Sequence, residues 1–340
     1  MRTEIMLWMI LFLFFQSAPS APKQDVPLPP TKVLDLTSSQ SLPIPFSRIL
    51  GECQCDDSGS IYFIFLPDKN AIRIIGAVKK ISPDPLSQTL FAIPADLASG
   101  DAKTKETFAA FRVTPSGKLW FLDRSQSGYF LVGFNDDGTV SSHTRLEVSD
   151  FVWAREFLIS NSGTVLLPGY YTKNASANVR GKRFFALFAK SGRLRADLAN
   201  EAGSDVDLKS VNVTESDSVG AAGPDGNFYF PRGNEILVIS EFGDMVRRIP
   251  LPRENLGEIV SRIDLSGGLL SLEFLVPMKD HPERLRPHYL VLEAATGEPF
   301  GVYEAGDDVG GAMACFSARN GYQYLVFDNG MIKLTTARLK

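Results

Sequence analysis

The stretch Gly223–Pro252, GPDGNFYFPRGNEILVISEFGDMVRRIPLP, is the clearest copy of a unit that recurs along this chain of 340 residues. It opens with a Pro-Asp-Gly turn, followed by an apolar segment, a short loop, a second apolar segment, another Gly turn and a charged segment. Pro, Asp and Gly between aromatic and aliphatic runs are typical of β-hairpins. The stretch therefore predicts a series of antiparallel strands.

Five other stretches repeat this opening. Each has a tripeptide that ends in Gly and leads directly into an apolar segment; the six tripeptides are residues 57–59, 115–117, 161–163, 224–226, 266–268 and 319–321. Their average spacing is about 52 residues, in the range of propeller or solenoid repeats. Because four units contain a second Gly turn followed by a polar segment, each unit has room for four strands, which is a propeller blade.

We therefore expect an all-β fold, a six-bladed β-propeller of four-stranded antiparallel blades, over residues 46–340. The last unit has only three predicted strands before Lys340. We expect the N-terminal strand Lys32–Leu36 to pair with this last blade and close the ring, because an unpaired blade edge invites aggregation. A pair of β-sandwiches would not predict six similar units, and seven blades would need a seventh turn.

The N-terminus resembles an export signal. Arg2 precedes the apolar run Ile5–Phe15, and small residues follow around Ser20, where we expect cleavage before Ala21. An apolar run this short cannot span a bilayer core of roughly 30 Å as a helix. The sequence predicts a signal peptide over residues 1–20, a Pro-rich linker with the ring-closing strand over 21–45, and a secreted or periplasmic protein without a stable membrane span after cleavage. An uncleaved anchor is the alternative.

Composition and missing motifs exclude several functions. A net charge of −4 gives no basic footprint for nucleic acid. The chain has three histidines and lacks the nucleophile-elbow, phosphate-loop, dinucleotide-binding and zinc-protease motifs. Of its three cysteines, Cys53 and Cys315 lie six residues before their turn glycines in the first and last units, which adjoin in a closed ring. The sequence leaves two states possible for Cys53 and Cys315, a disulfide between them or a pair of buried free thiols.

The innermost strand of each blade should be the segment just before the turn glycine. Seven residues before that glycine lie Glu52 and Glu156, among others, and Arg155, Asp217 and Arg262 are close to the same level. The channel mouth is therefore expected to carry carboxylates and arginines together. Such a ring suits a polar ligand or Ca²⁺, which prefers several oxygen ligands. The alternative is a solvated rim whose charges pair with each other.

The recurring turn and aromatic strand resemble six-bladed propellers of the NHL-repeat and gluconolactonase-like (TolB-like) group, over roughly residues 46–340. The resemblance implies either a binding scaffold, as in NHL propellers, or hydrolysis of lactones with a divalent metal held by acidic side chains. The stretch Ile49–Phe63 is similar to the first-blade motif of the lactonase group, which would make Glu52 a metal ligand, with Asp217 as a later one.

The sequence thus favours an exported binding or scaffold protein without a cofactor, whose partner is a protein, a glycan or a small polar ligand at one rim or at the channel mouth. The alternative is a metal-dependent lactonase or esterase that uses Glu52 and Asp217, with Ca²⁺ as the candidate metal.

Overall fold

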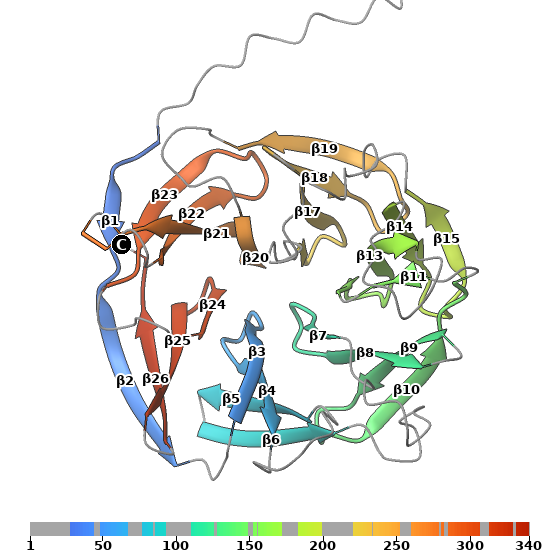
Figure 1. Cartoon of the computed structure of the whole chain (residues 1–340), viewed down its shortest axis with the longest axis horizontal. Helices are drawn as coiled ribbons and strands as arrows, with labels where there is room; N and C mark the ends of the chain where they lie inside the picture. Colours follow the sequence, from blue (N-terminus) through green and yellow to red (C-terminus); the bar gives the residue numbers. More distant parts are fainter. Residues whose placement is uncertain are drawn as a thin grey trace, which may run out of the picture.

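The computed structural model is a ring of six antiparallel sheets around a central channel (Figure 1). In the part of the chain that the structure describes, every regular element is a β-strand. The described residues are 28–43, 48–66, 77–83, 86–92, 110–125, 128–148, 152–154, 156–171, 183–198, 220–232, 234–251, 260–278, 280–281, 285–306, 313–328 and 331–339.

The first three blades follow one another along the chain. Blade one contains β3 (Arg48–Cys55), β4 (Ile61–Leu66), β5 (Ala77–Pro83) and β6 (Leu86–Ala92). Blade two contains β7 (Ala110–Val113), β8 (Leu119–Ser125), β9 (Gly128–Phe134) and β10 (Val140–Arg145). Blade three contains β11 (Val152–Trp153), β12 (Leu158–Ile159), β13 (Val165–Tyr171), β14 (Arg183–Phe188) and β15 (Leu194–Asp197).

The remaining blades continue the pattern. Blade four contains β16 (Ala221–Ala222), β17 (Phe228–Arg232), β18 (Glu235–Ile239) and β19 (Met245–Pro250). Blade five contains β20 (Val260–Ser266), β21 (Leu269–Pro277), β22 (Leu285–Glu293), β23 (Pro299–Glu304) and the N-terminal β1 (Thr31–Val33). Blade six contains β24 (Met313–Ser317), β25 (Gly321–Asp328), β26 (Met331–Ala337) and the N-terminal β2 (Leu36–Pro43). The predicted all-β, six-bladed propeller is confirmed.

The N-terminal chain closes the ring, as expected, but through a different segment. The closing strand is β2, which pairs antiparallel with β26 from Leu36–Ala337 to Pro43–Met331. The predicted strand Lys32–Leu36 lies largely before it, where β1 pairs in parallel with β23 on blade five. The prediction followed alternating apolar residues, whereas the outermost strand of blade six is polar and largely exposed. An exposed outer strand does not need the apolar alternation of a half-buried one.

Each interface between consecutive blades is filled by its own apolar cluster. Tyr62 and Phe91 of blade one pack with Phe121 of blade two, for example, and Tyr289 of blade five packs with Tyr322 of blade six. Most of the largest fully buried side chains are tyrosines and phenylalanines. Since burying one large apolar side chain contributes about 1.5–3 kcal/mol, the aromatic second and third strands of each unit hold the ring together.

The strand order places the loops on two distinct rims. The turn rim carries the loops after the first and third strands of each blade, such as residues 56–60 and 135–139, and the predicted turn glycines there have positive φ. At Gly192, a side chain would be impossible as well as strained, because a Cβ would lie 1.9 Å from the carbonyl oxygen of Arg145. The far rim is the opposite one, where the innermost strands begin.

No helix with the length and apolarity needed to cross a bilayer occurs in the ranges described above.

Candidate functional site

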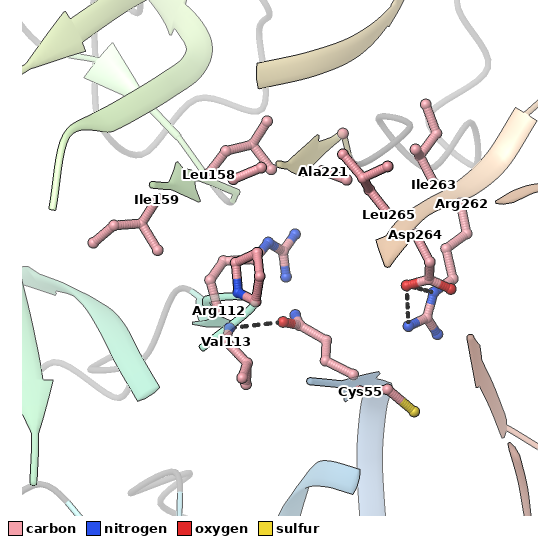
Figure 2. A pocket seen from close by; sticks show the side chains of 14 residues that line it. Cys55, Arg112, Val113, Leu158, Ile159, Ala221, Arg262, Ile263, Asp264 and Leu265 are labelled. Carbon is pink, nitrogen blue, oxygen red and sulfur yellow. Dashed lines mark hydrogen bonds and ion pairs between the residues drawn. The ribbon is translucent and has the colours of Figure 1, made fainter. Parts of the chain in front are cut away.

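The central channel is lined by the innermost strands, and it encloses a small cavity (Figure 2). The lining residues come from five blades and include Gln54, Arg112, Leu158, Ala221, Arg262, Asp264 and Leu265. The cavity measures about 60 Å³. Sites for organic ligands usually measure about 300–1,000 Å³, and one water needs about 10–15 Å³ on the same measure. The cavity therefore has room for a few waters but cannot enclose an organic ligand.

Gln54 on β3 connects blade one to blade two. Its side-chain amide donates to the carbonyl oxygen of Phe111 at 3.0 Å, and its side-chain carbonyl accepts the N–H of Val113 at 2.9 Å. Innermost strands have no further strand on their channel side, so their backbone groups there need other partners. The side chain of Gln54 supplies a donor and an acceptor to two backbone groups of β7, and it thereby holds β3 beside β7.

Arg112 on β7 makes the corresponding connection from blade two to blade three. Its Nε donates to the carbonyl oxygen of Phe157 at 2.9 Å. Its Nη1 donates to the carbonyl oxygen of Phe111, the preceding residue, at 2.8 Å. Nη2 forms an ion pair with Glu156, whose side chain is 30% exposed, against 9% for Arg112. The buried guanidinium is thereby paired and hydrogen-bonded, as a buried charge requires.

Arg262 on β20 connects blade five to blade six from the other side of the channel (Figure 2). Its Nε and Nη2 donate to one carboxylate oxygen of Asp264 at 3.1 and 2.9 Å, and Nη1 donates to the carbonyl oxygen of Ala314. Each described arginine of the channel thus has its own carboxylate. Both described pairs, Arg112–Glu156 and Arg262–Asp264, combine a positive with a negative charge.

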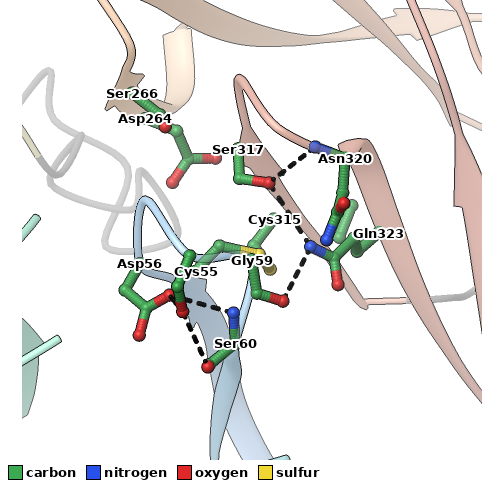
Figure 3. The surroundings of a disulfide bond; sticks show 12 residues. Cys55, Asp56, Gly59, Ser60, Asp264, Ser266, Cys315, Ser317, Asn320 and Gln323 are labelled. Carbon is green, nitrogen blue, oxygen red and sulfur yellow. Dashed lines mark hydrogen bonds between the residues drawn. A yellow bond between two sulfur atoms is a disulfide. The ribbon is translucent and has the colours of Figure 1, made fainter. Parts of the chain in front are cut away.

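The structure corrects the predicted disulfide. Cys55, not Cys53, is bonded to Cys315, with the Cα atoms 5.6 Å apart (Figure 3), and Cys53 is a buried thiol outside that bond. The prediction counted from the turn glycines, which occupy different places in the two hairpins. Gly321 is already the first residue of β25, whereas Gly59 lies two residues before β4 begins at Ile61. Counted from the second strand, Cys55 and Cys315 both lie six residues before it.

The predicted channel-mouth residues have different outcomes. Glu156 is paired with Arg112, and Arg262, which lines the cavity from blade five, is paired with Asp264. Glu52 belongs to β3, but its side chain is outside the described residues, as are Arg155 and Asp217 altogether. A mouth that combines all five residues therefore stays a prediction.

Three innermost strands depart from regular pairing near the predicted level. In β3, Leu50 and Cys53 pair with consecutive residues of β4, so Gly51 and Glu52 bulge out. In blade three, residues 154–157 separate β11 from β12, and in β20 a single extra residue, Ser261, precedes Arg262. Glu52, Glu156 and Ser261, the residues seven positions before their turn glycines, each lie within one of these irregular stretches. Bulges re-aim side chains and are common beside functional sites.

At the turn rim, the hairpin turns of different blades are tied to one another. Ser266 of blade five donates to the carboxylate of Asp57 in blade one at 2.6 Å and accepts the N–H of Ala318 in blade six at 3.0 Å. The N–H of Asp57 in turn donates to the carbonyl oxygen of Pro115 in blade two at 3.1 Å. Contacts that cross from blade one to blade five narrow this mouth of the channel.

Below these tips, the hydroxyl of Tyr62 lies between Asp56 of its own blade and Gly117 of blade two, and its contact with Gly117 joins the two blades. This hydroxyl donates to the carboxylate of Asp56 at 2.9 Å and to the carbonyl oxygen of Gly117 at 3.0 Å. Burial, together with the neighbouring negative charge of Asp56, raises the pKa of Tyr62 well above its ordinary value. The tyrosine stays neutral at physiological pH and acts as a structural donor.

Metal ligands are not evident among the described residues: no group of three or more His, Cys, Asp or Glu side chains gathers there. The two described carboxylates of the channel, Glu156 and Asp264, are each bound by an arginine. An arginine at this distance competes with a cation, so these two groups do not fit a metal site.

Sequence reasoning missed Gln54, Arg112 and Asp264. A signal for Arg112 was present, because it is the one charged residue in the short innermost strand AFRV. Gln54 stands between two cysteines and Asp264 two residues after an arginine, and neither pattern predicts a contact with another blade.

No protein-family model and no curated protein matches the sequence. Among solved structures, the WD40 domain of Pan2 from Neurospora crassa is similar at 10% identity, with 88% of this chain and 90% of that chain covered and a TM-score of 0.45. A protein of unknown function from Bacteroides caccae matches at 16% identity, with 74% and 80% covered and a TM-score of 0.43. BBS1N, from its complex with ARL6DN, matches at 10% identity, with 90% and 97% covered and a TM-score of 0.40. By its own sheet order, this chain is a six-bladed β-propeller.

Proposed function

We propose that this protein is an exported binding scaffold whose partner is another protein, held at the far rim around the channel mouth. The observation that carries the proposal is that three innermost strands are irregular at a similar level: β3 bulges at Gly51–Glu52, β20 bulges at Ser261, and the inner strand of blade three is interrupted between β11 and β12. Three unrelated irregularities at one level are more simply explained by a shared site than by chance, because bulges disrupt ladder pairing and are kept for a purpose.

Within the part of the chain that the structure describes, the channel interior suits a small-molecule site less well. The cavity of about 60 Å³ is too small to enclose an organic ligand. The hydrogen bonds among the hairpin turns narrow the turn-rim mouth. Irregular strands on three blades suit a protein, which can contact several blades at once, better than a small molecule or a single sugar.

An apolar ribbon in blade five adds a contact surface to the far rim. The pairing between β21 and β22 extends to Pro277 and Leu285. It continues past Phe274 and His288, the last residues of these two strands that pair with β20 and β23. Leu275 and Leu285 lie on the same face of this ribbon and are 41% and 55% exposed. Large exposed apolar side chains rimmed by polar groups are typical of protein interaction sites.

Two observations support export. The N-terminal sequence has the charged start, apolar run and small residues of a signal peptide. The Cys55–Cys315 disulfide is of a kind that persists outside the reducing cytoplasm. Among the families that the sequence resembles, the proposal places the chain with the NHL-type scaffolds rather than with the lactonases.

Photo-crosslinking in the native host tests the proposed rim. A photoreactive amino acid replaces Leu285 at the far rim or, as the matched control, Phe242 on the turn rim, which is 66% exposed. We expect one protein adduct from position 285 that is lost when Leu275→Asp is added, and no such adduct from position 242. Adducts from position 242 alone, or a non-protein adduct, would contradict the proposal.

A second candidate, the metal-dependent lactonase, is favoured by one observation, the bulge at Gly51–Glu52. A bulge there can turn Glu52 toward the channel, as a metal ligand needs. A Ca²⁺ or Zn²⁺ ion held by Glu52 would raise the melting temperature, and Glu52→Ala would remove the increase. The hydrolase hypothesis fails if neither ion shifts the melting temperature of the wild-type protein.

A further inference from the structure

The ring is closed twice, at different distances from the channel. On the outside, β2 pairs with β26 and completes blade six with the N-terminal chain. On the inside, the Cys55–Cys315 disulfide joins β3 of blade one to β24 of blade six, across 260 residues of sequence. These are the two blades between which the ends of the propeller meet, so both closures act on the same junction.

The disulfide faces the channel on one side. Cys55 is half-buried and lines the cavity, whereas Cys315 is 1% exposed and packs with Leu325 and Leu334 in the apolar cluster between the two blades. Cys53 is fully buried in the same cluster. A small reagent in the channel therefore meets the sulfur of Cys55 first.

The contacts around the disulfide extend to blade two and to the first hairpin turn of blade one, of which Figure 3 shows the second. Next to Cys55, Gln54 holds β7 of blade two. Opposite Cys315 on β25, Gln323 donates to the carbonyl oxygen of Gly59 in blade one at 3.1 Å. A change in the distance between β3 and β24 would therefore also move the bridge to blade two and the first hairpin turn.

We propose that the Cys55–Cys315 disulfide is a reducible inner closure, through which a small dithiol loosens the channel while the outer closure keeps the propeller folded. One thiolate of the dithiol attacks Sγ of Cys55, and the electron pair of the broken S–S bond leaves on Sγ of Cys315, which takes up a proton. The second thiolate of the dithiol then attacks the reductant sulfur that is bonded to Cys55, and Cys55 leaves and takes up a proton. The dithiol becomes a cyclic disulfide, and the two cysteines gain two electrons and two protons.

The inference goes beyond the proposed function and rests on other contacts. β3 and β24 belong to different sheets, so reduction removes the covalent bond between them and leaves apolar packing at their junction. The hydrogen bond from Gln323 to Gly59 and the bridge through Ser266 then still join the hairpin turns of the two blades. Seven residue pairs between β2 and β26 still join the chain ends. Opening should therefore be local to the junction between blades six and one.

Hydrogen exchange followed by mass spectrometry tests this on the full mature chain, oxidised or treated with dithiothreitol. We expect amides of β3 and β24 to exchange at least about tenfold faster after reduction, while β8 and β9 of blade two stay unchanged. The matched control Cys53→Ala keeps the disulfide and should respond to dithiothreitol as the wild type does.

The variant Cys315→Ala separates local opening from a general loss of structure. It should show the fast exchange of the reduced protein without dithiothreitol, and dithiothreitol should add nothing. If it does not fold, reduced wild type supplies the same comparison. Unchanged exchange after complete reduction would overturn the proposal, because the bond would then control nothing. Faster exchange in all six blades would overturn it too, because the bond would then be a global staple.

Discussion

Single charged residues in the channel connect one blade to the next rather than facing open solvent. Arg112 binds two backbone carbonyl oxygens and Glu156, and Arg262 binds Asp264 and the carbonyl oxygen of Ala314. When one member of such a buried pair is removed, the other is left as an uncompensated charge, which costs far more than the pair contributed.

Arg112→Met tests this at one position. Methionine fills similar space but removes the ion pair with Glu156 and the donor to the carbonyl oxygen of Phe157, whereas the carbonyl oxygen of Phe111 keeps Gln54 as a donor. We therefore expect a loss of about 2–4 kcal/mol in the free energy of unfolding. Urea denaturation measures it. The control Arg248→Met removes an exposed ion pair with Glu235 and should cost less than about 1 kcal/mol. Equal losses would contradict the assigned role of Arg112.

Gly133 allows the indole ring of Trp120 to lie against the sheet of blade two. A Cβ at Gly133 would lie 2.6 Å from Cζ3 of Trp120 and 2.7 Å from Oγ of Ser142. Gly133→Ala should therefore lower the free energy of unfolding by about 1–3 kcal/mol through overpacking. Gly306→Ala is the matched control, since nothing lies within 4 Å of its added Cβ. A neutral Gly133→Ala would mean that the ring shifts freely.

How far the site could be predicted depends on what each residue contacts. The spacing to the turn glycines predicts one level for Glu52 and Glu156, because a regular strand advances by a fixed length per residue. It carries no signal that Glu52 lies in a bulge of β3 or that Glu156 lies between β11 and β12. The pairing of Cys55 required the place of Gly321 within its hairpin, which spacing alone does not reveal. The partners of Gln54 and Arg112 lie on other blades, and a single sequence carries no signal for such contacts.

At the level of strands, the sequence predicted those with an apolar face and misplaced those without one. The second strands of the six blades, and the third strands of blades two to six, are rich in aromatic and aliphatic residues and lie where the pattern places them. In blade one, the pattern predicts the third strand at Ala71–Val78, whereas β5 runs from Ala77 to Pro83 and contains Lys79 and Lys80, which interrupt the apolar run. The closing strand β2 reads LTSSQSLP and has no such face, so the alternating Lys32–Leu36 was chosen in its place. A strand fixed by its backbone alone cannot be recognised from side-chain patterns.

Truncation separates the two N-terminal strands. A chain that starts at Ile44 lacks β1 and β2, and we expect a lower melting temperature and aggregation, because the edge of β26 becomes unpaired. A chain that starts at Leu34 lacks β1 but keeps the buried Leu34, and it should stay much closer to the chain that starts at Ala21. Thermal unfolding with light scattering measures both effects. If the first truncation melts like the full chain, β2 does not close the ring.

Across the whole molecule, buried tyrosines occur at several blade interfaces. Burial, reinforced by Asp225, raises the pKa of Tyr229 to about 12, and burial raises the pKa values of Tyr289, Tyr322 and Tyr324 above the ordinary value. The unfolded chain releases these protons near pH 10, whereas the folded protein retains them. The contribution of these hydroxyls to the free energy of unfolding is therefore fully present below pH 10. It is lost as the pH rises toward and beyond 12.

Alkaline denaturation tests that expectation. The urea midpoint should be lower at pH 11 than at pH 9, and tyrosinate absorbance should rise together with unfolding rather than before it. Tyr229→Phe removes one of these groups and should make the fall with pH less steep. An equal midpoint at both pH values would contradict the role of the buried hydroxyls.

The pairing of β2 with β26 also has a consequence for the order of events during synthesis. Leu36 finds its partner in Ala337, roughly 300 residues later, so at about 5–20 residues per second the strand waits on the order of 15–60 s before its partner exists. Throughout that time it is an unpaired segment near other nascent strands. Its Ser- and Thr-rich sequence has little tendency to associate with them. The same polarity that hides β2 in the sequence keeps it soluble until the last blade has been made.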